Sequence, residues 1–196
     1  MRFFFYYPTW NKPSGGNIQL RLSASMLSEM GVQSSLIHDS DFLADPSAFD
    51  DNVFYNLPVP VAPFGFSDAG KYLEDEDVLV LPEVLLDRTF PICAPWRCRI
   101  AVNNQNGFYA LRYRPPRWQC GRRIEFAIAN APYVAAINHR FLGIDPRRVF
   151  LVPHWVTHPP FDRTEDVDYR QLAVCYMPRK LPELMVRIRE LVDSHS

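Results

Sequence analysis

Residues 3–37 read FFFYYPTWNKPSGGNIQLRLSASMLSEMGVQSSLI, and this stretch decides the fold that the sequence predicts. The aromatic run at residues 3–7, which Pro8 ends, is typical of a strand buried on both faces. Apolar residues then recur every four positions, at Ile18, Leu22, Met26 and Met30, and Leu20, Ala24 and Leu27 widen the same face. This spacing indicates an amphipathic helix that ends at Gly31, and residues 32–37 predict the next strand. A strand, a loop, a helix and a second strand form the repeating unit of a parallel α/β sheet.

The rest of the domain continues this alternation. Short apolar runs bounded by turn-forming residues predict strands at residues 53–57, 78–81, 99–102, 133–137 and 149–152. Helical patterns lie between them, at residues 67–73, 122–129 and 139–142. The expected fold is therefore α/β, with a Rossmann-like parallel sheet and helices on both faces.

The composition limits the classes of partner. Of the 196 residues, 47% are hydrophobic, which is enough for a packed core and argues against disorder. The formal net charge of -1 gives no global basic field, so a duplex nucleic-acid partner is not predicted. The four cysteines form no CxxC pair, and none has a histidine at metal-ligand spacing, so no metal site is predicted.

Two sequence features bear on localisation. The apolar start of the chain is too short for a signal sequence. No apolar run approaches the roughly 18 residues of a membrane-spanning helix. We expect a soluble, cytoplasmic protein and leave peripheral membrane contact open.

The second half of the chain contains a predicted domain boundary. Residues 1–157 are expected to form one domain, because the polar, proline-bearing residues 158–169 are typical of a linker. Residues 172–177 predict a strand and residues 183–192 a helix. One strand and one helix cannot bury a core by themselves, so residues 170–196 are interpreted as the start of a second domain.

Polar residues follow the first predicted strand and the strand at residues 99–102. The candidates for substrate binding are Gly15, Gly16, Asn17, Asn103, Gln105 and Asn106. The glycine loop lets a ligand approach the backbone, and helix amides there can bind an anion. The amide side chains can both donate to and accept from sugar hydroxyls. Carboxyl ends of parallel strands share one edge, so we expect both groups together. The alternative is that both segments only form turns.

Three further residues are candidates for chemistry. His154 follows the strand predicted at residues 149–152, where it is either a catalytic or ligand-binding residue or a packing residue. Arg179 and Lys180 follow the strand predicted at residues 172–177 and are suited to a diphosphate. The alternative for this pair is a surface position at a helix start. No other residue stands out as catalytic.

Arginines and aromatic residues alternate in the segment from Arg112 to Arg123. Arginine with aromatic side chains can bind single-stranded nucleic acid, a phosphorylated acceptor, an acidic lipid surface or a partner chain. A solvated loop is the remaining interpretation.

Three stretches resemble the retaining GT-B glycosyltransferases. The loop from Pro8 to Gly15-Gly16-Asn17, followed by an amphipathic helix, resembles their amino-terminal start. VNNQN at residues 102–106 resembles the NQN strand end of a bacterial branch. AVCYMPRK at residues 173–180 resembles the IAYMPRK segment that opens their second domain.

The resemblance implies two Rossmann-like domains facing each other across a cleft, with the acceptor in the first and the nucleotide sugar in the second. Gly15 and Gly16 would face the donor phosphates. Arg179 and Lys180 would neutralise the leaving diphosphate. The resemblance implies no metal and no cofactor, since the nucleotide sugar is a co-substrate.

The chain departs from the family at two points. Many members carry a histidine near the strand end where this chain has Asn103 to Asn106, and the glutamate-bearing donor motif would follow Ser196. We therefore expect an incomplete hexosyl transferase that acts on a glycan or other acceptor: either the chain is a truncated gene product, or a separate donor-domain chain supplies the missing half. The alternative is a non-catalytic α/β binding module that uses the Arg112–Arg123 segment to bind a partner or nucleic acid.

Overall fold

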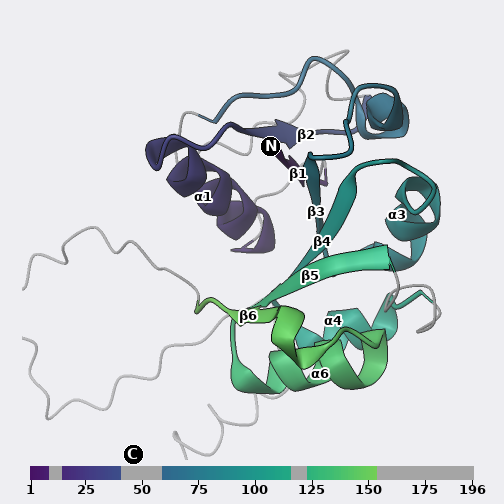
Figure 1. Cartoon of the computed structure of the whole chain (residues 1–196). Helices are drawn as coiled ribbons and strands as arrows, with labels where there is room; N and C mark the ends of the chain where they lie inside the picture. The colour runs from purple at the N-terminus through teal and green to yellow at the C-terminus, as the bar shows by residue number, and fades with distance from the viewer. Residues whose placement is uncertain (9–14, 41–58, 116–122, 154–196) are drawn as a thin grey trace, which may run out of the picture. The chain divides into compact units, whose positions relative to one another are not determined.

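The computed structural model describes residues 1–8, 15–40, 59–115 and 123–153 (Figure 1). The strands are β1 (Phe3–Tyr6), β2 (Ser34–Ile37), β3 (Val78–Pro82), β4 (Arg99–Asn104), β5 (Ile124–Ala129) and β6 (Val149–Leu151). The α-helices are α1 (Gly15–Glu29), α3 (Leu86–Cys93), α4 (Gly107–Arg112) and α6 (Pro132–Leu142). The short 3-10 helices are η2 (Phe66–Lys71) and η3 (Pro146–Arg148). The strand predicted at residues 53–57, the linker and the second-domain segment lie outside the described residues.

The six strands form one parallel sheet in the order β2-β1-β3-β4-β5-β6. The order reverses between β1 and β3, because β1 leads through α1 to β2 on one side and β3 leads through α3 to β4 on the other. This doubly wound arrangement confirms the predicted Rossmann-like α/β fold.

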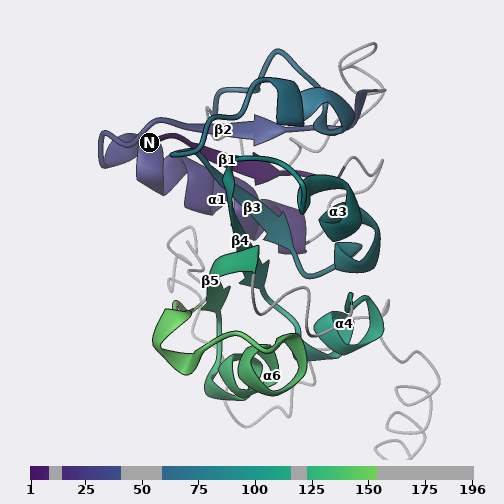
Figure 2. The ribbon, with the colours of Figure 1, turned by 45° about the vertical axis from the view of Figure 1, so that its right-hand side comes forward.

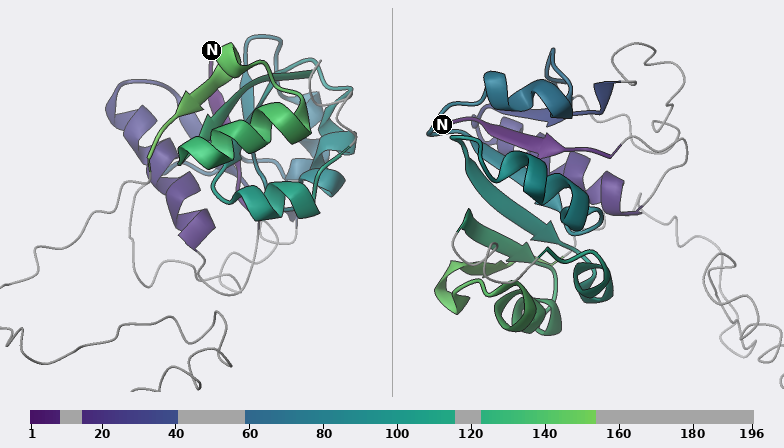
Figure 3. Two further views of the ribbon diagram at one scale, coloured as in Figure 1. Left: turned by 90° about the horizontal axis from the view of Figure 1, so that it is seen from below. Right: turned by 90° about the vertical axis from the view of Figure 1, so that its right-hand side faces the viewer.

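Helices cover both faces of the sheet (Figures 2 and 3). On one face, Leu20 and Ala24 of α1 pack in a cluster with Phe5 of β1. On the other face, residues of η2, α3 and α6 pack in a second cluster with Phe4. Successive strand residues point to opposite faces, so Phe4 and Phe5, 6% and 1% exposed, belong to different clusters. The prediction of a first strand buried on both faces is confirmed.

The strand predicted at residues 133–137 is wrong, because these residues belong to helix α6. Pro132 occupies the first turn, and Gly143 ends the helix in the left-handed conformation, with φ of 73°. Val134, Asn138 and Leu142 form its buried stripe at helical spacing. The helix predicted at residues 139–142 is the last part of this longer helix.

The helix predicted at residues 122–129 is also wrong, because Ile124–Ala129 form strand β5. This strand pairs with β4 on one side and β6 on the other. Its register shifts opposite Ile100 and Ala101, so Glu125 turns out to solvent while Phe126 contacts the α1 face. The helix start predicted at residues 67–73 is the 3-10 helix η2. Among the described residues, no helix is long and apolar enough to cross a bilayer.

Candidate functional site

The carboxyl ends of β1, β3 and β4 lie at the sheet edge where α1 begins. In open α/β sheets, ligands bind outside the carboxyl ends of strands at the point where the strand order reverses. That point lies between β1 and β3 in this sheet. We call the residues gathered there the strand-end cluster: Gly16, Asn17, Glu83, Asn103 and Gln105.

The start of α1 is tied to the end of β1 by Asn17. The Asn17 side chain is 2% exposed, and its amide nitrogen donates to the carbonyl of Pro8 at 3.0 Å. The helix begins at Gly15, and Gly16 is exposed at this end. No acidic residue lies in the first turn, so the positive end of the helix dipole is not neutralised within the helix.

Gln105 joins the glycine turn, which is the start of α1 at Gly15 and Gly16, to the end of β4. Its side-chain nitrogen donates to the backbone carbonyl of Gly16 at 3.0 Å, across 89 positions of sequence. The backbone carbonyl of Gln105 accepts a hydrogen bond from the side chain of Asn130, which follows β5, at 2.8 Å. The structure therefore brings together two of the residues that the sequence proposes for substrate binding.

Two of the other amide side chains at this strand end, those of Asn106 and Asn104, have structural partners. Asn106 is the N-cap of α4, because its side-chain oxygen accepts from the amide of Phe108 at 3.0 Å. Asn104 is fully buried and donates to Asn138 of α6 at 2.6 Å. Asn103 is 6% exposed and pairs in register with Pro82 of β3. Gln105 and Asn106 are thus the partly exposed amides at the strand end, and the side chain of Asn106 is occupied as a cap.

Glu83 is a site residue that the sequence analysis missed. It directly follows β3 and is only 5% exposed. Burial raises the pKa of its carboxyl to about 7, although backbone amides of Gln105 and Asn106 hydrogen-bond the carboxylate and oppose the shift. A carboxyl group with a pKa near neutrality can hold or release a proton at physiological pH, which is the property of a general acid or base.

The backbone beside Glu83 is strained. Leu85, the N-cap of α3, has φ of 65° and ψ of 13°, a left-handed conformation that leucine rarely adopts. It is the one positive-φ residue other than glycine among the residues that the structure describes. Such strain persists where the surroundings over-determine it, and it often occurs at functional sites.

His38 is the second buried titratable residue at this edge. It follows β2, is 2% exposed, and its ring lies 5.0 Å from the ring of Tyr7, which follows β1. Burial lowers the pKa of His38 to about 4, and the positive charge of Arg21 adds to the shift. The imidazole is therefore neutral at pH 7. Because β1 separates β2 from β3, the ends that carry His38 and Glu83 lie roughly 10 Å apart.

Other candidates fall outside the described residues. These are His154, Arg179 and Lys180, so the structure does not place them relative to the strand-end cluster. The signal that could have identified Glu83 is a carboxylate placed directly after the buried run Val78–Pro82. A carboxylate at the carboxyl end of a central parallel strand lies where such folds bind ligands.

The Arg112–Arg123 segment is divided in its role. Arg123 is structural, because its guanidinium donates to the backbone carbonyls of Ala94, Trp96 and Cys98. Arg112 and Arg114 are exposed. The structure thus leaves only the amino-terminal part of this segment accessible among the residues it describes.

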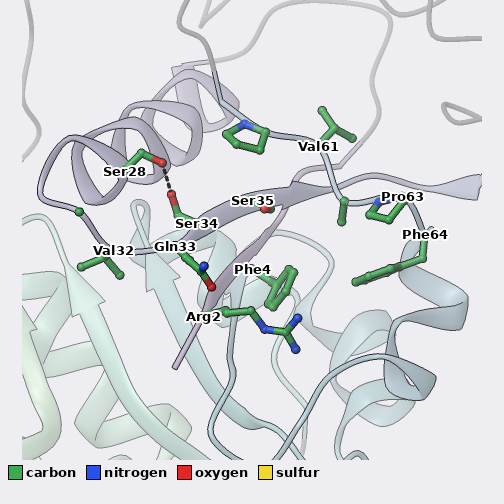
Figure 4. A pocket seen from close by; sticks show the side chains of 13 residues that line it. Arg2, Phe4, Ser28, Val32, Gln33, Ser34, Ser35, Val61, Pro63 and Phe64 are labelled. Carbon is green, nitrogen blue, oxygen red and sulfur yellow. Dashed lines mark hydrogen bonds between the residues drawn. The ribbon is translucent and has the colours of Figure 1, made fainter.

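A cavity of about 580 Å³ lies at the opposite end of the strands (Figure 4). It is lined by Arg2 and Gln33, which precede β1 and β2, and by the segment from Pro60 to Phe64. The Arg2 guanidinium is held by Asp77 at 2.6 Å. Its charge is therefore already compensated, and the cavity is remote from the strand-end cluster.

Comparisons with known proteins assign no family. A scan against models of known protein families finds no match, and a search of curated proteins finds none either. Within the described part of the chain, no group of three or more His, Cys, Asp or Glu residues could hold a metal ion.

Proposed function

We propose that the described domain is the acceptor-side half of a GT-B-type glycosyltransferase, which transfers a hexose from a nucleotide sugar to a glycan or other acceptor. The observation that carries this proposal is the hydrogen bond from Gln105 to Gly16. It joins the glycine turn at the start of α1 to the amide-rich end of β4, beside buried Glu83. A nucleotide sugar needs both parts side by side: a helix start for its diphosphate and amide side chains for its sugar.

The start of α1 supplies the anion-binding part. Backbone amides in the first turn of a helix have no partner within the helix, and its dipole favours negative charge there. In the proposed complex, the donor diphosphate faces Gly15 and Gly16. Both positions lack a Cβ, so the phosphate oxygens can approach the backbone closely.

The sugar-binding part consists of Asn103 and Gln105. An amide side chain both donates and accepts, which matches the hydroxyl groups of a sugar ring. Glu83 is the proposed proton acceptor for the attacking hydroxyl. Its proton affinity near pH 7 suits that step, and the proton of the acceptor hydroxyl passes to its carboxylate as the new glycosidic bond forms.

A donor-side half is required for turnover. Arg179 and Lys180 are proposed to neutralise the diphosphate as it leaves with the pair of electrons of the broken glycosidic bond. In this proposal, a donor-binding domain supplies the remaining nucleotide contacts. The chain by itself is then expected to bind nucleotide sugars weakly and to transfer none.

Calorimetric titration of the full chain with UDP-glucose, UDP-N-acetylglucosamine and GDP-mannose tests the proposal. We expect weak binding of at least one donor, reduced about fivefold by Gln105→Ala, the effect of one lost hydrogen bond. Gln33→Ala is the matched control, because Gln33 is exposed at the opposite end of the strands. Equal affinities for the two variants, or no binding of any donor, would contradict the proposed site. Hexose transfer by the chain alone would contradict the proposal that the described domain is one half of the enzyme.

A further inference from the structure

Helices α4 and α6 lie side by side on one face of the sheet (Figures 1 and 3). They approach closely at Gly107, where a Cβ would meet the side chains of Ile137 and Tyr133. These helices and the residues directly after α4 carry exposed aromatic and arginine side chains. We call it the α4–α6 surface: Phe108, Tyr109, Arg112, Arg114, Tyr133 and Arg140.

The aromatic side chains of this surface are unusually exposed. Phe108 is 72% exposed, Tyr133 53% and Tyr109 42%. Phe108 and Arg112 are four residues apart, as are Tyr109 and Tyr113, so each pair lies on one side of α4. A contiguous patch of exposed apolar side chains often marks an interaction surface, whereas a single exposed apolar residue is ordinary.

The arginines of the surface stack on aromatic rings. Arg112 lies over Tyr113 at 5.4 Å, and Arg114 and Arg140 lie over Phe141 at 5.7 Å and 5.9 Å. None of the three forms an ion pair with any carboxylate of the described residues. Their guanidinium groups are therefore held in place while their charges stay available to an anion.

The charge of the chain is unevenly distributed. Between Arg99 and Ile144 the sequence contains a single carboxylate, Glu125, which pairs with Arg99 at 2.9 Å. The formal net charge of the whole chain is -1, so acidic residues outnumber basic ones elsewhere. The segment that contains α4 and α6 is therefore locally basic, which favours contact with an anionic surface.

We propose that the α4–α6 surface docks on a membrane that contains anionic phospholipids. Arginine charges bind the headgroup phosphates, while Phe108, Tyr109 and Tyr133 enter the interfacial region, where amphipathic aromatic rings are favoured. A broad layer made of two neighbouring helices fits a planar surface. Single-stranded nucleic acid would instead be held in a basic groove.

Co-sedimentation of the full chain with lipid vesicles tests this proposal. The vesicles are phosphatidylcholine alone, or equal parts of phosphatidylcholine and phosphatidylglycerol. We expect binding to the anionic vesicles only, weakened in 1 M salt, where the Debye length falls to about 3 Å. The charge variant combines Arg112→Gln, Arg114→Gln and Arg140→Gln. It should bind about a hundredfold more weakly, at about fivefold per arginine.

Matched variants separate the surface from total charge and total hydrophobicity. The charge control combines Arg88→Gln, Arg97→Gln and Arg147→Gln, which are exposed elsewhere. It should bind like the wild type. Phe108→Ala should weaken binding about tenfold. Ile92→Ala, at a position 48% exposed on α3, should have no effect. Circular dichroism spectra should be the same for all variants, because only exposed side chains change.

Three results would overturn the proposal. The first is absence of binding to the anionic vesicles, and the second is equal loss of binding in the charge variant and its control. The third is tighter binding of a single-stranded RNA than of the vesicles through the same three arginines, which would assign the surface to nucleic acid.

Discussion

Glu83 and His38 give the free energy of unfolding opposite dependences on pH. The pKa of Glu83 rises from 4.5 to about 7 on folding, so between these values the folded state keeps a proton that the unfolded state releases. The pKa of His38 falls from 6.5 to about 4, so between these values only the unfolded state binds the proton. Stability rises with pH where the unfolded state binds more protons. Glu83 therefore lowers stability from pH 4.5 to 7, and His38 raises it from pH 4 to 6.5.

The two contributions are similar in size. A tenfold change in a proton equilibrium corresponds to about 1.4 kcal/mol, so each residue changes the free energy of unfolding by about 3 kcal/mol across its range. Both side chains are at least nine-tenths buried, so solvent screening removes little of this energy. In the wild type, the two effects nearly cancel between pH 4.5 and 6.5.

Urea denaturation from pH 4.5 to 8 measures each contribution separately. In Glu83→Gln the free energy of unfolding should rise by about 3 kcal/mol between pH 4.5 and 6.5, because only the His38 contribution remains. In His38→Gln it should fall by about the same amount up to pH 7. Glu125→Gln and His139→Gln are the matched controls, because both residues are exposed. Both controls should follow the wild-type profile.

The refuting result is a Glu83→Gln profile parallel to that of the wild type. It would show that Glu83 ionises in the folded chain as it does in the unfolded chain. The proposed proton acceptor would then be a permanent carboxylate, held by the amides of Gln105 and Asn106, with no affinity for a proton near pH 7.

The other predictions concern stability, measured by urea denaturation. Gly70→Ala should cost about 1–3 kcal/mol, because its Cβ would lie 2.6 Å from the indole nitrogen of Trp96. Asp77→Ala should cost about 2 kcal/mol, and less in acid, because Arg2 hydrogen bonds lower the pKa of this buried carboxylate. Arg123→Met should cost about 2 kcal/mol, since three backbone carbonyls before β4 lose their donor. An unchanged free energy of unfolding in any variant would contradict the importance of that contact.

The first strand and helix could be predicted because their local pattern agrees with their tertiary environment. The aromatic run of β1 is buried on both faces, as a central parallel strand requires. The details of α1 depend on packing. Its innermost residues are Leu20 and Ala24, whereas Met26 and Met30 of the predicted repeat are 45% and 74% exposed. Met30 lies beyond the last residue of α1, which spans Gly15–Glu29.

The two wrong elements are neighbours in the sequence and similar in composition. Both β5 and α6 contain short runs of alanine and branched apolar residues, which periodicity alone cannot assign to strand or helix. The useful local signals were Pro132 at the first turn and Gly143 after the last one. Strand β5 has no comparable local signal, because its ladder partners β4 and β6 decide its conformation.

The candidate site could be predicted only in part, because topology places some of its residues and tertiary contacts decide the rest. The glycine turn and the amide-rich strand end could be placed at one sheet edge from topology alone, since carboxyl ends of parallel strands share an edge. The pKa of Glu83 depends on tertiary structure, because it is set by burial and by backbone amides more than 20 positions away in the sequence. The capping role of Asn106 likewise depends on tertiary structure, because it requires that α4 start at Gly107. No helix was predicted there from the sequence.

The start of α4 connects the two proposals physically. Asn106 caps α4 through its side chain, and its backbone amide lowers the pKa of Glu83, so this one residue connects the strand-end cluster to the helix that carries the α4–α6 surface. Phe108 follows only two positions later. Docking of α4 on a membrane would therefore hold Gln105 and Glu83 close to the headgroup layer. An acceptor anchored in that membrane would reach the strand-end cluster without leaving the lipid, which reduces its search from three dimensions to two.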